Sequence, residues 1–143
     1  MTTISLRQAD DIADRVLEGG VKLESKPLTV AVLDAGGHLV VSKRQDGSGI
    51  ARLQIAQGKA RGALGMGMGS RAIANLAADR PLFVAGAASL EGVELVPAAG
   101  GVLVRDEAGA VLGAVGVSGD ISDVDERCAV EAIEAGGLVA DTG

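Results

Sequence analysis

Two segments of the sequence have the pattern of a β-hairpin, and they constrain the fold more than any other feature. Residues 28–44, LTVAVLDAGGHLVVSKR, place runs rich in β-branched residues on both sides of DAGG. Residues 100–119, GGVLVRDEAGAVLGAVGVSG, place two similar runs around DEAG. Asp and Gly favour tight turns, and β-branched residues favour strands. The sequence therefore predicts two antiparallel hairpins.

Helical patterns stand before the first hairpin and after the second. Ser5 and Gln8 have the spacing of a capping box, and apolar residues then recur on one face until a Gly-Gly pair. Ser122 and Asp125 have the same spacing at the start of the last pattern, which also ends at Gly-Gly. We expect a helix at each end of the chain.

The middle of the chain is harder to interpret. Residues 48–69 carry apolar residues at helical spacing, although Gly58 and Gly62 weaken the helix by about 1 kcal/mol each relative to Ala. These two glycines share one face, where missing side chains admit another backbone; the alternative is a poorly formed helix that frays at its end. Residues 70–81 predict a further short helix, and residues 82–87, LFVAGA, a short strand.

The order of elements indicates an α+β fold. A helix, a hairpin, two helices, a short strand, a second hairpin and a last helix give an antiparallel sheet of about five strands flanked by helices. A length of 143 residues fits a single domain over residues 1–143.

Composition limits the partners and the core. The net charge is −6 and the 13 Lys and Arg residues are scattered, which disfavours nucleic acid and anionic membranes. No apolar run approaches 18 residues and the first residues lack a leader pattern, so we expect a soluble, cytoplasmic protein without a membrane partner. Aromatic residues make up 1%, so the core must be aliphatic, and few large anchors favour stabilisation by subunit contacts. Cys128 stands alone and is expected to pack in the core.

Five polar or glycine positions are candidates for a small-molecule site. Arg44 and Asp46 are two apart at a strand exit, where they either grip a polar ligand or form a surface pair and a turn. Lys59 lies in the apolar helix, where a buried amine binds an anion or acts as an acid or base, unless it extends to water. Gly100 and Gly101 either let a ligand approach the backbone or form an ordinary turn.

His38 is the one histidine of the chain and the candidate metal ligand. It follows the first hairpin turn, and its ring nitrogens suit haem iron or another metal; the alternative is a turn residue without such a role. Met66 and Met68 carry thioethers, but apolar packing at the helix end is the simpler interpretation.

Four segments together resemble the GlcG/HbpS family, which includes haem-binding proteins and the C-terminal domain of PduO. The similarity runs from about residue 6 to residue 135 in the family's order and spacing, through VAVLDAGGHLVVSKRQDG, IAQGKARGAL, GGVLVRDEAGAVLGAVGVSGD and DVDERCAVEA. The resemblance implies an α+β fold with a central antiparallel sheet, assembled as dimers or as larger rings such as octamers. It also implies haem binding or haem degradation.

The matched positions and the departures both bear on the ligand. The positions that match family features are Asp34, Gly36, Gly37, Arg44, Asp46, Gly47, Lys59, Ala60, Gly100, Gly101, Gly113, Gly116, Ser118 and Gly119. The chain has GGVLV where the family commonly has Gly-Gly-Val-Pro-Ile, and residues 81–96 do not match closely. Because those residues would wall a pocket, ligand identity is the least constrained expectation.

Three hypotheses for function follow. By resemblance, the chain is a cytoplasmic, homo-oligomeric haem-binding protein, with assistance in haem degradation as an extension. Alternatively, it is an enzyme acting on a small oxygenated or carboxylated metabolite, in which Arg44 orients the substrate and Lys59 or Asp46 moves a proton. The third hypothesis is an accessory or structural subunit without a ligand.

Overall fold

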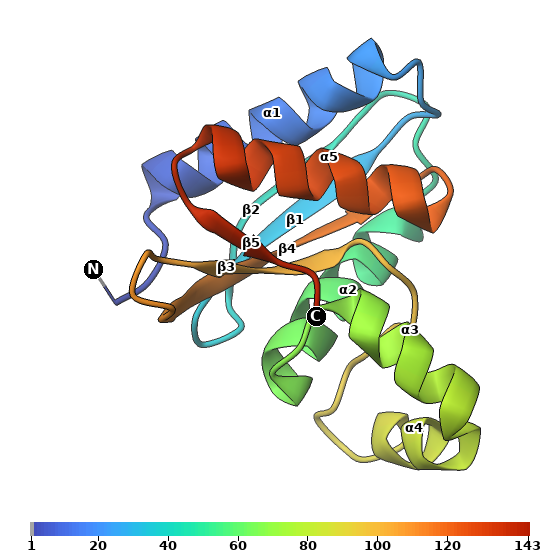
Figure 1. Cartoon of the computed structure of the whole chain (residues 1–143). Helices are drawn as coiled ribbons and strands as arrows, with labels where there is room; N and C mark the ends of the chain where they lie inside the picture. Colours follow the sequence, from blue (N-terminus) through green and yellow to red (C-terminus); the bar gives the residue numbers. More distant parts are fainter. Residues whose placement is uncertain (1) are drawn as a thin grey trace.

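The two predicted hairpins supply four strands of one antiparallel sheet. The computed structural model describes residues 2–143, and within them the strands pair in the order β2-β1-β4-β3-β5 (Figure 1). The first hairpin joins β1 (Thr29–Asp34) to β2 (Leu39–Arg44). The second joins β3 (Gly101–Arg105) to β4 (Val111–Ser118), and β1 pairs with β4. The predicted α+β class is confirmed.

The fifth strand comes from the end of the chain. Strand β5 (Val139–Asp141) pairs with β3, whereas residues 82–87, for which we predicted a strand, lie in helix α4 (Pro81–Ala88). That prediction was wrong because Pro81 occupies the first helical turn, where its missing N–H costs nothing, and the alanines that follow are strong helix formers.

Helices cover both faces of the sheet. Helices α1 (Leu6–Lys22) and α5 (Ser122–Ala135) pack together on one face, and α2 (Arg52–Met66) lies on the other. Helix α3 (Ser70–Asp79) follows α2, and α3 and α4 extend away from the sheet (Figure 1). No helix within residues 2–143 combines the length and the apolar character needed to span a bilayer.

The core beneath α1 and α5 is aliphatic, as the composition requires. Alternate residues of the central strands point into it, among them Val30, Val32, Val102, Val104, Val115 and Val117. Cys128 is buried in the same cluster, which confirms the expectation for it. Burial raises the pKa of its thiol to about 11, so Cys128 stays a packing residue at neutral pH.

The helix ends differ in how they are capped. Ser5 and Gln8 form the predicted capping box, with N–H···O distances of 3.0 and 3.1 Å. At the start of α5 the predicted box is absent, because the Asp125 carboxylate accepts hydrogen bonds from Asp120 N and Lys59 Nζ instead.

Glycines let α2 lie directly on the sheet. A Cβ atom at Gly116 would overlap the carbonyl oxygen of Ala56, and one at Gly101 would overlap the carbonyl of Lys59. The outer side of α2 uses glycine in the same way: a Cβ at Gly58 would come within 2.8 Å of the Val96 side chain, and one at Gly62 within 2.8 Å of Leu95 Cβ. The predicted close approach of another backbone is confirmed at Gly62, where Leu95 Cα would be 3.0 Å from the added Cβ, whereas Gly58 receives the Val96 side chain. Helix α2 is therefore supported from both sides.

We expect Gly116→Ala to lower the free energy of unfolding by about 1 to 3 kcal/mol or more, because the added methyl group forces α2 off the sheet. Urea unfolding followed by far-UV circular dichroism measures the change. Gly65→Ala is the matched control in α2: no atom lies within 4 Å of the added Cβ, and the substitution should stabilise by about 0.5 to 1 kcal/mol. Equal effects at the two positions would contradict this account of the contact.

Candidate functional site

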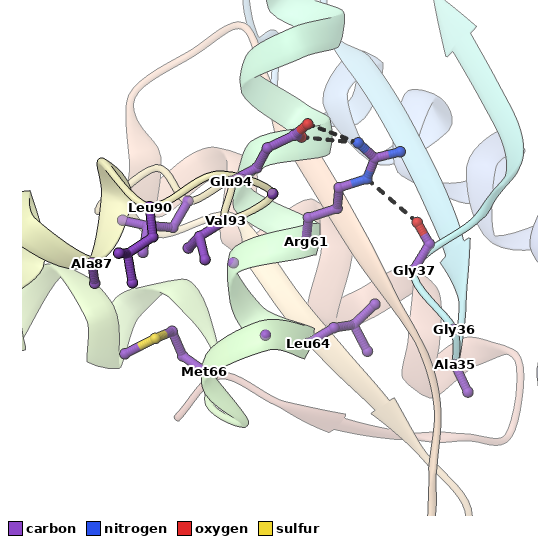
Figure 2. Close-up of a pocket in the computed structure, with 14 residues that line it drawn as sticks. Ala35, Gly36, Gly37, Arg61, Leu64, Met66, Ala87, Leu90, Val93 and Glu94 are labelled. Atoms are coloured by element: carbon purple, nitrogen blue, oxygen red, sulfur yellow. Dashed lines mark hydrogen bonds and ion pairs between the residues drawn. The ribbon is translucent and has the colours of Figure 1, made fainter.

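A hollow of about 570 Å³ lies between α2, the turn that joins β1 to β2, and the segment that joins α4 to β3 (Figure 2). Its walls are mostly apolar: Leu64 and Met66 come from α2, and Leu90, Val93 and Leu95 come from the connecting segment. The volume is within the usual range for small-molecule sites, about 300 to 1,000 Å³.

The β1–β2 turn forms one rim of the hollow and is held by Asp34. Asp34 Oδ1 accepts hydrogen bonds from the backbone N–H groups of Gly36 and His38, each at 3.0 Å. These bonds, and above all the bond from the His38 N–H, hold the pKa of Asp34 below its ordinary value. Gly37 has φ +84°, a conformation that glycine adopts without strain. The turn therefore presents a fixed backbone to the hollow.

His38 lies at this rim with its side chain 82% exposed. Its Nδ1 is 3.3 Å from Asp34 Oδ1. The ring lies beside Gly36, a lining residue, since a Cβ atom there would be 3.0 Å from both Nδ1 and Cε1 of His38. The imidazole thus lies next to a residue that lines the hollow, with Nδ1 toward Asp34, while His38 itself is not among the lining residues.

An ion pair stands at the edge of the hollow, and the sequence analysis did not single it out. Arg61 Nη1 donates to both carboxylate oxygens of Glu94, at 2.9 and 3.0 Å, and Arg61 Nε donates to Gly37 O at 3.3 Å (Figure 2). A signal for Arg61 was present, because it lies three residues after Gly58 and three before Leu64 on the helix. Nothing in the sequence places Glu94 opposite it.

Lys59 is buried in the middle of α2, beside Gly100 and Gly101. Its Nζ donates to Val117 O at 2.9 Å and to Asp125 Oδ2 at 3.2 Å, and its side chain is 4% exposed. Burial lowers the pKa of Lys59 and raises that of Asp125. A Cβ atom at Gly100 would be 2.9 Å from Lys59 Nζ, and the Gly101 N–H donates to Ser70 Oγ at 2.7 Å. The structure therefore brings Lys59, Gly100 and Gly101 together in the interior.

Arg44 and Asp46 do not share a strand face. Strand β2 ends at Arg44, and Ser48 N donates to Gln45 O in the turn that follows. Arg44 lines a small hollow of about 170 Å³ together with Thr29. Within residues 2–143, neither Arg44 nor Asp46 forms a hydrogen bond or ion pair with Lys59. The ligand-binding and acid–base roles assigned to these residues from the sequence stay predictions.

Comparison with known proteins identifies the family. The model of the HbpS-like family, described as haem degrading protein HbpS-like, matches residues 4–134. The chain therefore belongs to the HbpS-like family. A comparison with curated proteins gives no match.

Solved structures share the whole fold. The crystal structure of a PduOC–haem complex is 23% identical, with a TM-score of 0.82 over 93% of this chain and 94% of that one. HbpS is 28% identical, with a TM-score of 0.79 over 94% and 90% of the two chains. Protein ORFY of Klebsiella pneumoniae is 25% identical, with a TM-score of 0.82 over 94% and 93%.

The buried pair gives a prediction for stability. Lys59→Met leaves the Asp125 carboxylate in the interior without its cation, which should cost about 3 to 5 kcal/mol at pH 7. Because the folded state then holds the pKa of Asp125 further above its unfolded value, protonated Asp125 favours folding. The variant should gain stability as the pH falls through the folded pKa toward 3.8, and lose it again as the pH rises.

Urea unfolding between pH 4 and 8 measures this pH dependence. Asp125→Asn added to Lys59→Met should recover much of the loss, because Asn still accepts the Asp120 N–H and carries no charge. The same double variant should lack the pH dependence of Lys59→Met. If both variants followed the same pH profile, Asp125 would not be its source.

Proposed function

We propose that the chain binds haem in the hollow beside α2, where His38 would be a ligand of the iron. The observation that carries the proposal is the position of the His38 imidazole, which lies beside Gly36, a residue that lines the apolar hollow. An apolar cleft for the macrocycle and a ring nitrogen for the iron are the two elements that haem ligation requires.

The walls of the hollow suit the faces of a porphyrin. They carry Leu64, Met66, Leu90, Val93 and Leu95, and no aromatic side chain is among the lining residues. Burial of porphyrin area against aliphatic side chains is favourable at about 25 cal/mol per Å². The hollow is open on one side, so a flat ligand can enter without passing through the core.

Asp34 supports the ligand role of His38. Its carboxylate lies 3.3 Å from Nδ1, which favours the tautomer with a proton on Nδ1. The lone pair of Nε2 is then free to bind iron. A carboxylate on the second ring nitrogen is the usual arrangement behind a metal-ligating histidine, because it fixes the ring and raises its basicity. When bound, haem would bring its iron to that nitrogen, while Asp34 would keep the ring in place.

The family supports haem as the ligand. The matching model is described as haem degrading, and HbpS, 28% identical, shares the fold over most of both chains. PduOC, whose fold is also shared, was crystallised as a haem complex. Assistance in haem degradation is the finer part of the proposal, and the family description is its support. The cytoplasmic location stays a prediction from the sequence.

Titration of the purified protein with hemin should give a saturable, stoichiometric shift of the Soret band, and His38→Ala should weaken binding at least tenfold. Absorption spectroscopy measures both. Asp34→Asn is an intermediate case, since it removes the charge next to Nδ1, and it should weaken binding less than His38→Ala. Faster decay of the Soret band with a reductant than for free hemin would support degradation.

Two outcomes would change this picture. Absence of a saturable shift would contradict haem binding. A shift that is unchanged in His38→Ala would instead assign the iron to another group, and Met66, whose thioether lines the hollow, would be the next residue to replace.

We also propose that the chain is a homo-oligomer, a dimer or a larger ring. Helix α4 supports this because it packs mainly on α3 and leaves large apolar side chains in solvent: Leu82 is 87% exposed and Phe83 46%, and Leu90, just after the helix, is 62% exposed. Contiguous apolar groups of this kind mark interaction surfaces on soluble proteins. The near absence of aromatic anchors in the core points the same way.

Light scattering after size exclusion should give a mass of at least two chains for the natural sequence. Leu82→Asp should lower that mass, because it puts a charge in the interface while leaving the interior intact. Leu6→Asp is the control: Leu6 is also exposed, at 66%, but lies on α1. A monomer at all concentrations would contradict the proposal.

A further inference from the structure

The hollow has one cation and one carboxylate among its lining residues, and they bind each other. Arg61 comes from α2 and Glu94 from the segment between α4 and β3. Both side chains stand at the same edge, next to the β1–β2 turn, while the rest of the lining is apolar or glycine (Figure 2). The hollow is therefore amphipathic, with all its charge at one edge.

Arg61 keeps one N–H₂ group without a partner in the described part of the chain. Nη1 serves the Glu94 carboxylate and Nε serves Gly37 O, but Nη2 has no hydrogen-bond partner within residues 2–143 (Figure 2). The bond to Gly37 O holds the guanidinium in place when Glu94 moves away. A planar guanidinium with free N–H groups is the group that best recognises a carboxylate.

The Arg61–Glu94 pair is of the kind that a ligand can replace. The side chains are 38% and 53% exposed, so water screens their attraction and Glu94 can be rehydrated when it leaves. The Lys59–Asp125 pair is the opposite case, at 4% and 1% exposed, and it cannot open without stranding a buried charge. Of these two pairs, only Arg61–Glu94 can exchange partners.

We infer that the hollow selects ligands with a carboxylate at one edge of an apolar body, and that Arg61 binds this carboxylate in place of Glu94. The inference rests on the proposed function in that haem, with its propionates, belongs to this class. Arg61 is then a specificity-determining residue, and Glu94 is a competitor that lowers affinity for every such ligand. With a net charge of −6, the protein has no general attraction for anions, so recognition must be local.

Protoporphyrin IX and its dimethyl ester test the role of the carboxylate without that of the iron. Neither compound contains iron, so no axial ligand is needed, and only protoporphyrin IX carries free propionates. The natural sequence should bind the free acid about tenfold more tightly than the ester, and Arg61→Gln should abolish that preference. Glu94→Gln should raise affinity for the free acid about twofold to fivefold and leave the ester unchanged. Absorption titration measures all six affinities, two for each of the three proteins.

Glu131→Gln is the matched control. Glu131 is paired with Arg127 at a similar exposure, 60% and 55%, but it lies on α5 and not at this hollow, so the variant makes the same change in net charge without freeing Arg61. Its affinities should equal those of the natural sequence. Circular dichroism on each variant checks that the fold is retained.

A second pair of probes keeps this inference separate from haem binding. Dodecanoate has a free carboxylate on an apolar body and its methyl ester does not, and neither contains a porphyrin. Calorimetric affinities for the two should depend on Arg61 and Glu94 in the same way as the porphyrin affinities. If hemin binds but neither pair of probes distinguishes acid from ester, haem binding stands and the role of Arg61 is overturned. If porphyrins do not bind but dodecanoate binds through Arg61, the inference stands and haem binding is overturned. A preference that survives Arg61→Gln, or no binding of any probe, overturns the inference.

Discussion

The contact between the α2 backbone and the sheet is the constraint on which the rest of the structure depends. Gly101 and Gly116 remove the side chains that would keep a helix at the usual distance from a sheet, so peptide groups of α2 touch the strands directly. This contact fixes the height and the angle of α2. Because Arg61, Leu64 and Met66 all project from α2, the position of the hollow follows from two glycines on the sheet.

Lys59 joins α2 to α5, which lies on the other face of the sheet. Its ammonium group reaches the carbonyl oxygen of Val117 at the end of β4 and the carboxylate of Asp125 on α5. A buried pair contributes less to net stability than to the choice of one arrangement, because any shift of either helix leaves a charge without its partner. This pair thus joins α2 to α5 past the end of β4, seven residues before Met66, which lines the hollow.

Local chemistry made most of the fold predictable and left the site out of reach. The Asp-Gly turns, the alternating β-branched runs and the Ser5 cap are short-range signals, and the structure has each of them. Residues 82–87 failed because a run of small apolar residues suits a strand or a helix, and Pro81 decided between them. The Asp125 side chain does not cap α5 as predicted, because it binds Lys59, which is 66 residues away in the sequence. Likewise, Arg61 and Glu94 meet only after the chain has folded, so no spacing rule could join them.

The contact between α2 and the segment that joins α4 to β3 has a consequence for how the wall of the hollow can vary. Leu95 and Val96 rest on Gly62 and Gly58, so this part of the wall of the hollow lies on a helix surface without side chains, and the Arg61–Glu94 pair adds a side-chain contact beside it. A wall attached in this way can change its sequence without a compensating change in the sheet or in the core beneath α1 and α5. The fold thus separates the residues that hold α2 on the sheet from the residues that shape one wall of the hollow.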